Sequence, residues 1–207
     1  MRTLYVVTHP QATHHVDGIV GGWHDSDLTP AGVEAAGRIS EALRTAIPGD
    51  AAVELYSSDL KRTSQTTEVI GKRFELEPVY DARLREKSFG VVEGRPKAEW
   101  ERRFTPPPVD GDRMAHRTIP GSESTTEVAQ RIYNAVAAIA QRPCEHQIVV
   151  THGFALTFVV AAWIRMPVES LGYAVFKAKS GSITTLHEDD LYRSRVVVSL
   201  GDTAHLS

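Results

Sequence analysis

The chain has 207 residues, of which 42% are hydrophobic and 24% charged, as is ordinary for a soluble globular protein. Its formal net charge of −3 argues against nucleic acid or an anionic membrane as a partner bound through bulk electrostatics, but it permits a local basic pocket. The single cysteine, Cys144, excludes an internal disulfide framework. The N-terminus lacks a charged region followed by an apolar one, and the longest apolar segment, residues 154–164, is too short to span a membrane. We therefore expect a cytoplasmic protein.

Two short apolar runs, residues 4–8 and 147–151, each end in Thr. Each is followed by His and then by a residue that does not continue a regular strand. Both predict buried strands that deliver an imidazole at their carboxyl ends, His9 in the first case and His152 in the second. In an open α/β sheet that edge is where ligands bind. The two histidines are therefore expected to face one another across one site.

The first half of the chain reads as repeated strand and helix units. A polar, glycine-rich segment, residues 11–27, lacks periodicity and predicts a loop long enough to have a function. Thr29 and Pro30 then begin a helix that ends near residues 48–49. The following elements are a strand at residues 53–57, a helix that opens at residues 58–59 and runs toward residue 74, and a short strand at residues 77–80.

The second half is less regular. The predicted elements are an irregular charged region at residues 84–94, a short helix at 95–104, a proline-rich exposed segment at 105–112, a helix capped by residues 121–124, a buried apolar helix at 154–164, and two strands at 182–186 and 195–200 about a turn at 188–190. No linker separates domains. We therefore expect one α/β domain, residues 1–207, with an inserted excursion at about residues 93–120.

Two histidines at equivalent strand ends favour a shared chemical site over two separate structural histidines. Imidazole can attack phosphorus and form a covalent intermediate, which divides one difficult step into two. Such chemistry needs a cation, a proton donor and a backbone N–H, and Arg62, Glu86 and Gly153 could supply them. Considered singly, Arg62 could equally be a solvated surface residue, and Glu86 could form a surface ion pair with Arg85 or Lys87.

Several motifs occur in a fixed order along the chain. They are Thr8-His9-Pro10, Gly22-Trp23-His24-Asp25, Leu28-Thr29-Pro30-Ala31-Gly32, the segment 57–66, Leu84-Arg85-Glu86 with Phe89-Gly90 and Glu93-Gly94, Gly121-Ser122-Glu123-Ser124, and Val150-Thr151-His152-Gly153. Over nearly its full length the chain resembles the histidine phosphatase superfamily, with Thr8-His9-Pro10 where that family has Arg-His-Gly. The resemblance implies the phosphoglycerate-mutase-like fold, a three-layer α/β/α arrangement with a mostly parallel central sheet.

The resemblance also implies a phosphatase that needs no metal and no other cofactor. His9 is expected to accept the phosphoryl group from a small phosphorylated substrate, Arg62 and His152 to bind it, and Glu86 to act as proton donor and later as base. The expected substrate-binding positions are Thr8, His15, Gly21, Gly22 and Gly153. No nucleic acid or membrane partner is expected, and a homodimer stays open.

The chain departs from the family pattern beside the nucleophile. Threonine offers phosphate one hydroxyl and no charge, whereas the arginine that Thr8 replaces offers a charged planar fork. Losing such a contact could lower the rate by on the order of 10²–10³. Where the family often has an asparagine, this chain has His15, next to His14; one hypothesis is that one of the two becomes protonated and restores part of the charge, so that activity favours mildly acidic pH. The alternative places both histidines in a solvent-facing loop.

Three other functions stay open. A mutase is less favoured than a hydrolase because the chain has no long basic insertion to hold a bisphosphate. Thr8 also allows a catalytically weakened or inactive binding protein. A metal hydrolase would use His9, His14, His15, His24 and Asp25, although their spacing matches no helical ligand pair. The basic residues of the excursion could cover an anion or form a solvated face; they are Lys97, Arg102, Arg103, Arg113 and Arg117.

Overall fold

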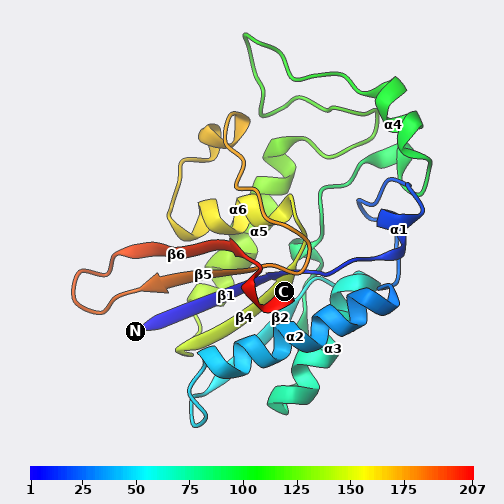
Figure 1. The fold of residues 1–207 in the computed structure, drawn as a ribbon. Coiled ribbons are helices and arrows are strands. Elements are labelled where there is room, and N and C mark those ends of the chain that lie inside the picture. The colour runs from blue at the N-terminus through cyan, green and yellow to red at the C-terminus, as the bar shows by residue number, and fades with distance from the viewer.

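A central sheet of six strands organises the computed structural model, which describes all residues 1–207 (Figure 1). The strands are β1 (Arg2–Thr8), β2 (Val53–Ser57), β3 (Val79–Tyr80), β4 (His146–Thr151), β5 (Ile183–Glu188) and β6 (Arg195–Asp202). They lie in the order β3-β2-β4-β1-β5-β6. The first four pair in parallel and the last two join β1 as an antiparallel hairpin. The predicted mostly parallel sheet is confirmed.

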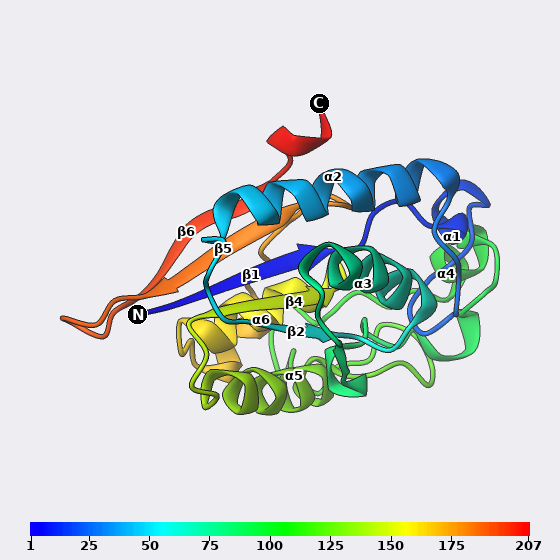
Figure 2. The same cartoon turned by 90° about the horizontal axis from the view of Figure 1, so that it is seen from below.

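Helices cover both faces of this sheet, which confirms the predicted three-layer arrangement. Figure 2 shows α2 and α3 on one side and α5 and α6 on the other. The α-helices are α1 (Thr13–Val16), α2 (Pro30–Ala46), α3 (Lys61–Phe74), α4 (Lys97–Arg103), α5 (Thr125–Ala140) and α6 (Ala155–Trp163). Short 3-10 helices are η1 (Ala82–Leu84), η2 (Gly90–Val92), η3 (Val168–Gly172) and η4 (Ala204–Leu206). None of these helices combines the length and the apolar character needed to cross a membrane.

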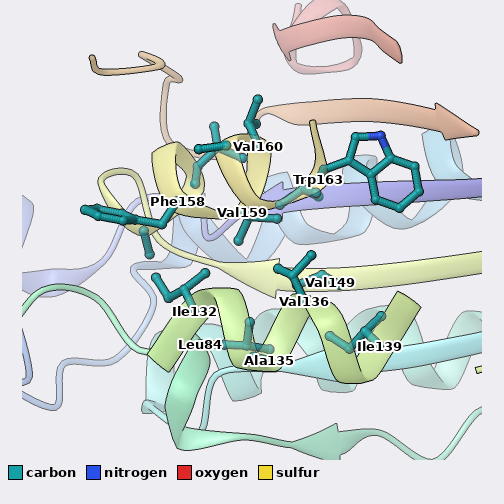
Figure 3. Close-up of a cluster of buried hydrophobic side chains, with 14 of the residues drawn as sticks. Leu84, Ile132, Ala135, Val136, Ile139, Val149, Phe158, Val159, Val160 and Trp163 are labelled. Atoms are coloured by element: carbon teal, nitrogen blue, oxygen red, sulfur yellow. The ribbon is translucent and has the colours of Figure 1, made fainter. Parts of the chain in front are cut away.

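The central position of β1 explains its unbroken apolar sequence. Leu4 and Val6 belong to the larger core cluster, which lies against α5 and α6, whereas Tyr5 and Val7 belong to a second cluster against α2 and α3. A parallel strand buried on both faces has no polar side to expose. Figure 3 shows the larger cluster, in which side chains of α5 and α6 meet those of the sheet. Helix α6 is almost wholly apolar because it is buried on most sides, as its sequence predicts.

Helix starts follow the local sequence. Thr29 caps α2 by accepting a hydrogen bond from Gly32 N, and Pro30 occupies the first turn. Ser124 and Glu127 form a reciprocal capping box at α5. These caps set the direction in which each helix leaves the edge of the sheet where β1 and β4 end.

The structure differs from the sequence predictions in local detail. The predicted loop at residues 11–27 contains α1, a single helical turn. Strand β3 has only two residues, because Pro78 lacks an N–H and cannot extend the ladder toward residue 77. Strands β5 and β6 are longer than predicted, and η3 and η4 were not predicted. Within the excursion, α4 matches the predicted short helix, and the segment after it extends away from the sheet (Figure 1).

Candidate active site

The two strands with the Val-Val-Thr-His sequence are neighbours in the sheet. Thr8 of β1 stands opposite Thr151 of β4, and His9 N donates to Thr151 O at 3.0 Å. The ring centroids of His9 and His152 are 5.1 Å apart, with the rings inclined at 70°. The sequence repeat therefore marks one site built by two adjacent strand ends.

His9 is held in a single neutral form. Its Nδ1 lies 2.7 Å from Pro10 O, and because a carbonyl oxygen only accepts, Nδ1 carries the proton. The other nitrogen, Nε2, keeps its lone pair and accepts a hydrogen bond of 3.2 Å from Arg62 Nε. Burial, reinforced by the charge of Arg62, lowers the pKa of His9 well below its ordinary value. The imidazole is therefore neutral at neutral pH, and its Nε2 electron pair carries no proton and accepts the hydrogen bond from Arg62.

Arg62 is a buried cation and not a surface residue. It is the second residue of α3 and is only 1% exposed. Its Nη1 donates to His24 O at 2.8 Å, and its Nη2 donates to Gly22 O at 2.6 Å. Burial lowers its pKa to about 10, so the guanidinium stays charged at neutral pH. No carboxylate forms an ion pair with it. Its charge is thus available to an anion beside His9.

His152 has one ring nitrogen without a partner. Its Nε2 lies 2.9 Å from Ser58 Oγ, whereas Nδ1 is buried and makes no hydrogen bond. Burial lowers the pKa of His152 well below its ordinary value. A buried polar nitrogen without a partner is uncommon, so this nitrogen is available to a ligand that reaches it. Ser58 was not predicted as a site residue, although it immediately follows the β2 strand and opens the turn into α3.

Glu86 lies at the N-terminus of α6. Its carboxylate accepts backbone N–H bonds from Lys87 at 2.9 Å, Phe154 at 3.1 Å and Ala155 at 3.0 Å. The alternative of a surface ion pair with its neighbours is wrong, since Arg85 pairs with Asp59 instead. Burial raises the pKa of the Glu86 carboxyl, against the opposing effect of these backbone bonds. A carboxyl group with a raised pKa is suited to donating a proton.

Glycines occupy the positions where the backbone approaches the site. At Gly21, a Cβ would lie 2.9 Å from the ring of His14. Gly22 has a φ of +59°, and a Cβ there would lie 2.5 Å from Glu93 Oε1. Gly153 precedes α6, and its N–H donates no hydrogen bond within the chain. A side chain at Gly21 or Gly22 would therefore collide with His14 or Glu93, and the N–H of Gly153 is left without a partner beside His152.

The surroundings of His14 and His15 disfavour the hypothesis that one of them supplies charge when protonated. His15 stacks on His9 at 5.6 Å and accepts a hydrogen bond from Ala12 N at its Nδ1. His14 is buried against Ser26 Oγ at 2.7 Å. Burial lowers the pKa of both rings, that of His14 to about 3. Burial and the nearby charges of Arg62 and Lys97 favour the neutral form of both rings near pH 7. The solvent-facing alternative is wrong for His14, which is buried.

Thr8 lies at the wall of the cavity, but its hydroxyl is already used. Its Oγ1 donates to Lys179 O at 2.7 Å, lies 3.0 Å from Ser182 Oγ and accepts from Ser182 N at 3.1 Å. The residue is 1% exposed. Its one donor is therefore turned to the segment that precedes β5 and is not free for a phosphate.

A cavity of about 430 Å³ opens over these groups. Its lining residues are Thr8, His9, His14, His15, Ile19, Val20, Gly21, Gly22, Arg62, Glu86, Phe89, Lys97, Trp100, Glu101, Gly153, Ala178 and Ser180. Of the five basic residues of the excursion, only Lys97 reaches this cavity. Helix α4 contributes Lys97, Trp100 and Glu101 to the cavity lining. Composition could not predict this, because it depends on where the excursion lies relative to the rest of the site.

The metal-hydrolase alternative does not fit the arrangement of the donor groups. Nowhere in the chain do three or more His, Cys, Asp or Glu side chains gather in a way that could hold a metal ion. Asp25, one of the proposed ligands, instead accepts a hydrogen bond from Lys61 N at the start of α3. His9 directs one nitrogen to a carbonyl and the other to a guanidinium. The side chains that the metal-hydrolase alternative needs are therefore engaged elsewhere and do not form a metal site.

The fold and this constellation together define a class of protein: an α/β enzyme with a neutral histidine, a buried arginine and a carboxyl group around one cavity. The family model of the histidine phosphatase superfamily, branch 1, matches residues 4–200. The chain belongs to the histidine phosphatase superfamily.

Known relatives agree with this membership. The probable phosphoglycerate mutase GpmB of Yersinia pestis is 30% identical over 215 residues, with 100% of this chain and 95% of the relative covered. A mycobacterial glucosyl-3-phosphoglycerate phosphatase in complex with VO3 superimposes with a TM-score of 0.80 at 25% identity, covering 98% of this chain and 100% of its own. YhfR of Bacillus stearothermophilus gives a TM-score of 0.78 at 28% identity, with 100% of both chains covered.

Proposed function

We propose that the protein is a phosphatase that hydrolyses a small phosphate monoester through a phosphohistidine on His9. The observation that carries this proposal is the fixed tautomer of His9, with Nδ1–H bonded to Pro10 O and the Nε2 lone pair directed at the buried guanidinium of Arg62. A nucleophile needs an electron pair that carries no proton, and a cation beside it stabilises the transferring oxygens.

The first step transfers the phosphoryl group to the enzyme. Nε2 of His9 forms a bond to phosphorus, the bond between phosphorus and the ester oxygen breaks, and Glu86 donates its proton to that oxygen. The charge of Arg62 and the free N–H of Gly153 support binding of the three remaining oxygens, and His152 does so in the tautomer in which Ser58 Oγ donates to Nε2 and Nδ1 carries the proton. The alcohol then leaves.

The second step returns the enzyme to its starting state. Glu86, now a carboxylate, accepts a proton from water as the water oxygen bonds to phosphorus. The bond between Nε2 and phosphorus breaks, inorganic phosphate is released, and His9 regains its lone pair. The same carboxyl group thus acts as acid and then as base, which its position between the cavity and the N-terminus of α6 supports.

The test is a search for the covalent intermediate with a panel of phosphate monoesters. The wild-type protein is expected to release phosphate and to give an acid-labile phosphoprotein after rapid quenching. The His9→Ala variant is expected to give neither, while a His205→Ala variant, whose ring lies outside the cavity, serves as the control. Undiminished turnover by His9→Ala would show that the proposal is wrong, and binding of phosphate esters without turnover by the wild type would favour the inactive binding protein.

A second candidate is a phosphoglycerate mutase, because the relative GpmB has that name at 30% identity over its length. A mutase returns the phosphoryl group to the substrate instead of to water. Incubation with 3-phosphoglycerate separates the two functions. Accumulation of 2-phosphoglycerate identifies a mutase, and release of inorganic phosphate identifies a phosphatase.

A further inference from the structure

Arg131 lies on the second turn of α5, outside the cavity, and its guanidinium is largely enclosed. It makes five hydrogen bonds: to the carbonyl oxygens of Arg83, Arg85 and Glu86, and to both carboxylate oxygens of Glu123. All three carbonyl groups belong to the segment that bears the proposed proton donor. The proposed mechanism assigns no role to this arginine.

The carbonyl groups of residues 83–86 belong to the end of η1 and the irregular residues after it, so no α-helix or ladder occupies them. Arg131 Nη1 donates to Arg83 O at 2.8 Å and to Arg85 O at 2.6 Å, and Nη2 donates to Glu86 O at 2.8 Å. The remaining carbonyl of the run, Leu84 O, accepts from Thr151 Oγ1 at 2.8 Å. Side chains from distant elements therefore hold every carbonyl group from residue 83 to residue 86.

Glu123 holds the chain on the other side of Glu86, at Ser88. Its carboxylate pairs with Arg131 at 2.8 and 2.9 Å and accepts a hydrogen bond of 2.8 Å from Ser88 N. Its own N–H donates to Ser88 O at 3.0 Å. The pair of Arg131 and Glu123 thus fixes the chain on both sides of Glu86, while the carboxyl group of Glu86 rests on the N–H groups of α6.

We propose that Arg131, together with Glu123, is a positioning residue that holds Glu86 where it can protonate the leaving oxygen. Arg131 bonds to the Glu86 backbone and not to its carboxyl group, so it acts through geometry. This inference rests on the proposed function, because it assigns to Arg131 the placement of that proton donor. A rigid support matters here, since a displacement of about 1 Å in a catalytic group can lower a rate by on the order of 10².

Two kinds of substrate separate a misplaced proton donor from a general loss of structure. The alkoxide released from an alkyl phosphate is strongly basic and needs a proton as it leaves. The phenolate released from 4-nitrophenyl phosphate is a stable anion and needs little help. A displaced Glu86 therefore lowers kcat/KM for the alkyl ester far more than for the aryl ester. The ratio of the two values does not depend on how much of a preparation is folded.

The experiment measures this ratio for the wild type, Arg131→Met, Arg131→Lys and Glu123→Gln, with 4-nitrophenyl phosphate and an alkyl phosphate that the wild type hydrolyses. Glu86→Gln gives the reference for complete loss of the proton donor, where general acid catalysis contributes about 10²–10⁴. Arg142→Met is the matched control. Arg142 also pairs with a glutamate, Glu54, but lies near the opposite end of β4.

Arg131→Met is expected to lower the alkyl-to-aryl ratio by roughly 10-fold or more, in the direction of Glu86→Gln. Arg131→Lys keeps the charge but loses the planar fork, so it is expected to recover part of the ratio. Glu123→Gln is expected to lie between wild type and Arg131→Met, and Arg142→Met to match wild type. If both esters lose rate in parallel in the Arg131 and Glu123 variants, Arg131 only stabilises the fold and the inference is wrong. A Glu86→Gln ratio equal to that of wild type contradicts instead the role of Glu86 in the proposed function.

Discussion

At the scale of single residues, the site owes its chemistry to how each polar group is partnered. His9 has one nitrogen committed to a carbonyl and the other directed at Arg62, so its tautomer is fixed before a substrate arrives. The sequence could predict His9 and His152 because both follow the same strand pattern. It could not predict the direction of the Thr8 hydroxyl, which depends on residues 179–182, more than 170 positions away.

The Thr8→Val variant separates a structural role of this residue from a role in binding. Valine has nearly the same shape but lacks the hydroxyl, and the hydrogen bonds to Lys179 and Ser182 are lost. The free energy of unfolding is expected to fall by about 1–3 kcal/mol, as for other buried polar groups that lose a partner. Urea denaturation measures this change. We expect kcat/KM to stay unchanged, and a raised KM with unaltered stability would instead place Thr8 in contact with the substrate.

At the scale of elements, the strands and the caps of α2 and α5 were predictable because they depend on local sequence. The side of the cavity formed by α4 was not, because it depends on contacts between distant segments. The start of α4 is attached to the loop after α1: Val20 N donates to Arg95 O at 2.8 Å, and Lys97 N donates to Gly18 O at 3.0 Å. These contacts bring Lys97, Trp100 and Glu101 to the cavity, on one face of α4. Composition showed only that the excursion is basic. It could not show which of its charges faces inward.

The position of Lys97 leads to a prediction about selectivity. Apart from Arg62, it is the one lysine or arginine that lines the cavity. Lys97→Met is expected to lower kcat/KM by about tenfold or more for esters that carry a second anionic group, since a charged hydrogen bond contributes roughly 1.5–3 kcal/mol. Esters with an uncharged alcohol should be affected much less. Arg103→Met is the control, because this residue lies on the same helix and outside the cavity. Equal losses for both classes of ester would contradict the prediction.

At the scale of the whole molecule, the buried histidines link stability to pH. His9, His14 and His152 are all buried in neutral form, with their pKa values lowered by burial. In the unfolded chain each histidine titrates near pH 6.5. Between that pH and the folded value, the unfolded state binds more protons, so the folded state loses stability as the pH falls. For His14 this window extends from about 6.5 down to about 3.

Denaturation at several pH values tests this linkage. From pH 7 to pH 5, each such histidine is expected to lower the free energy of unfolding by about 2 kcal/mol. The His14→Gln variant removes one of these groups, so its stability should decline less steeply than that of the wild type over the same range. Urea midpoints at pH 7, 6 and 5 provide the measurement. Parallel curves for the two proteins would mean that His14 is protonated in the folded state as readily as in the unfolded one.

The strand order also has a consequence for how the protein is made. Strands β1 and β2 do not pair with each other, and both pair with β4, which separates them in the sheet. During translation β1, the strand that precedes His9, therefore has no partner until β4 is made about 140 residues later, roughly 7–30 s at usual rates of synthesis. Until β4 and β5 have been made, the backbone N–H and C=O groups of β1 lack their partners in the sheet. The N-terminal half, which carries His9, can therefore complete its part of the sheet only after β4 has been synthesised.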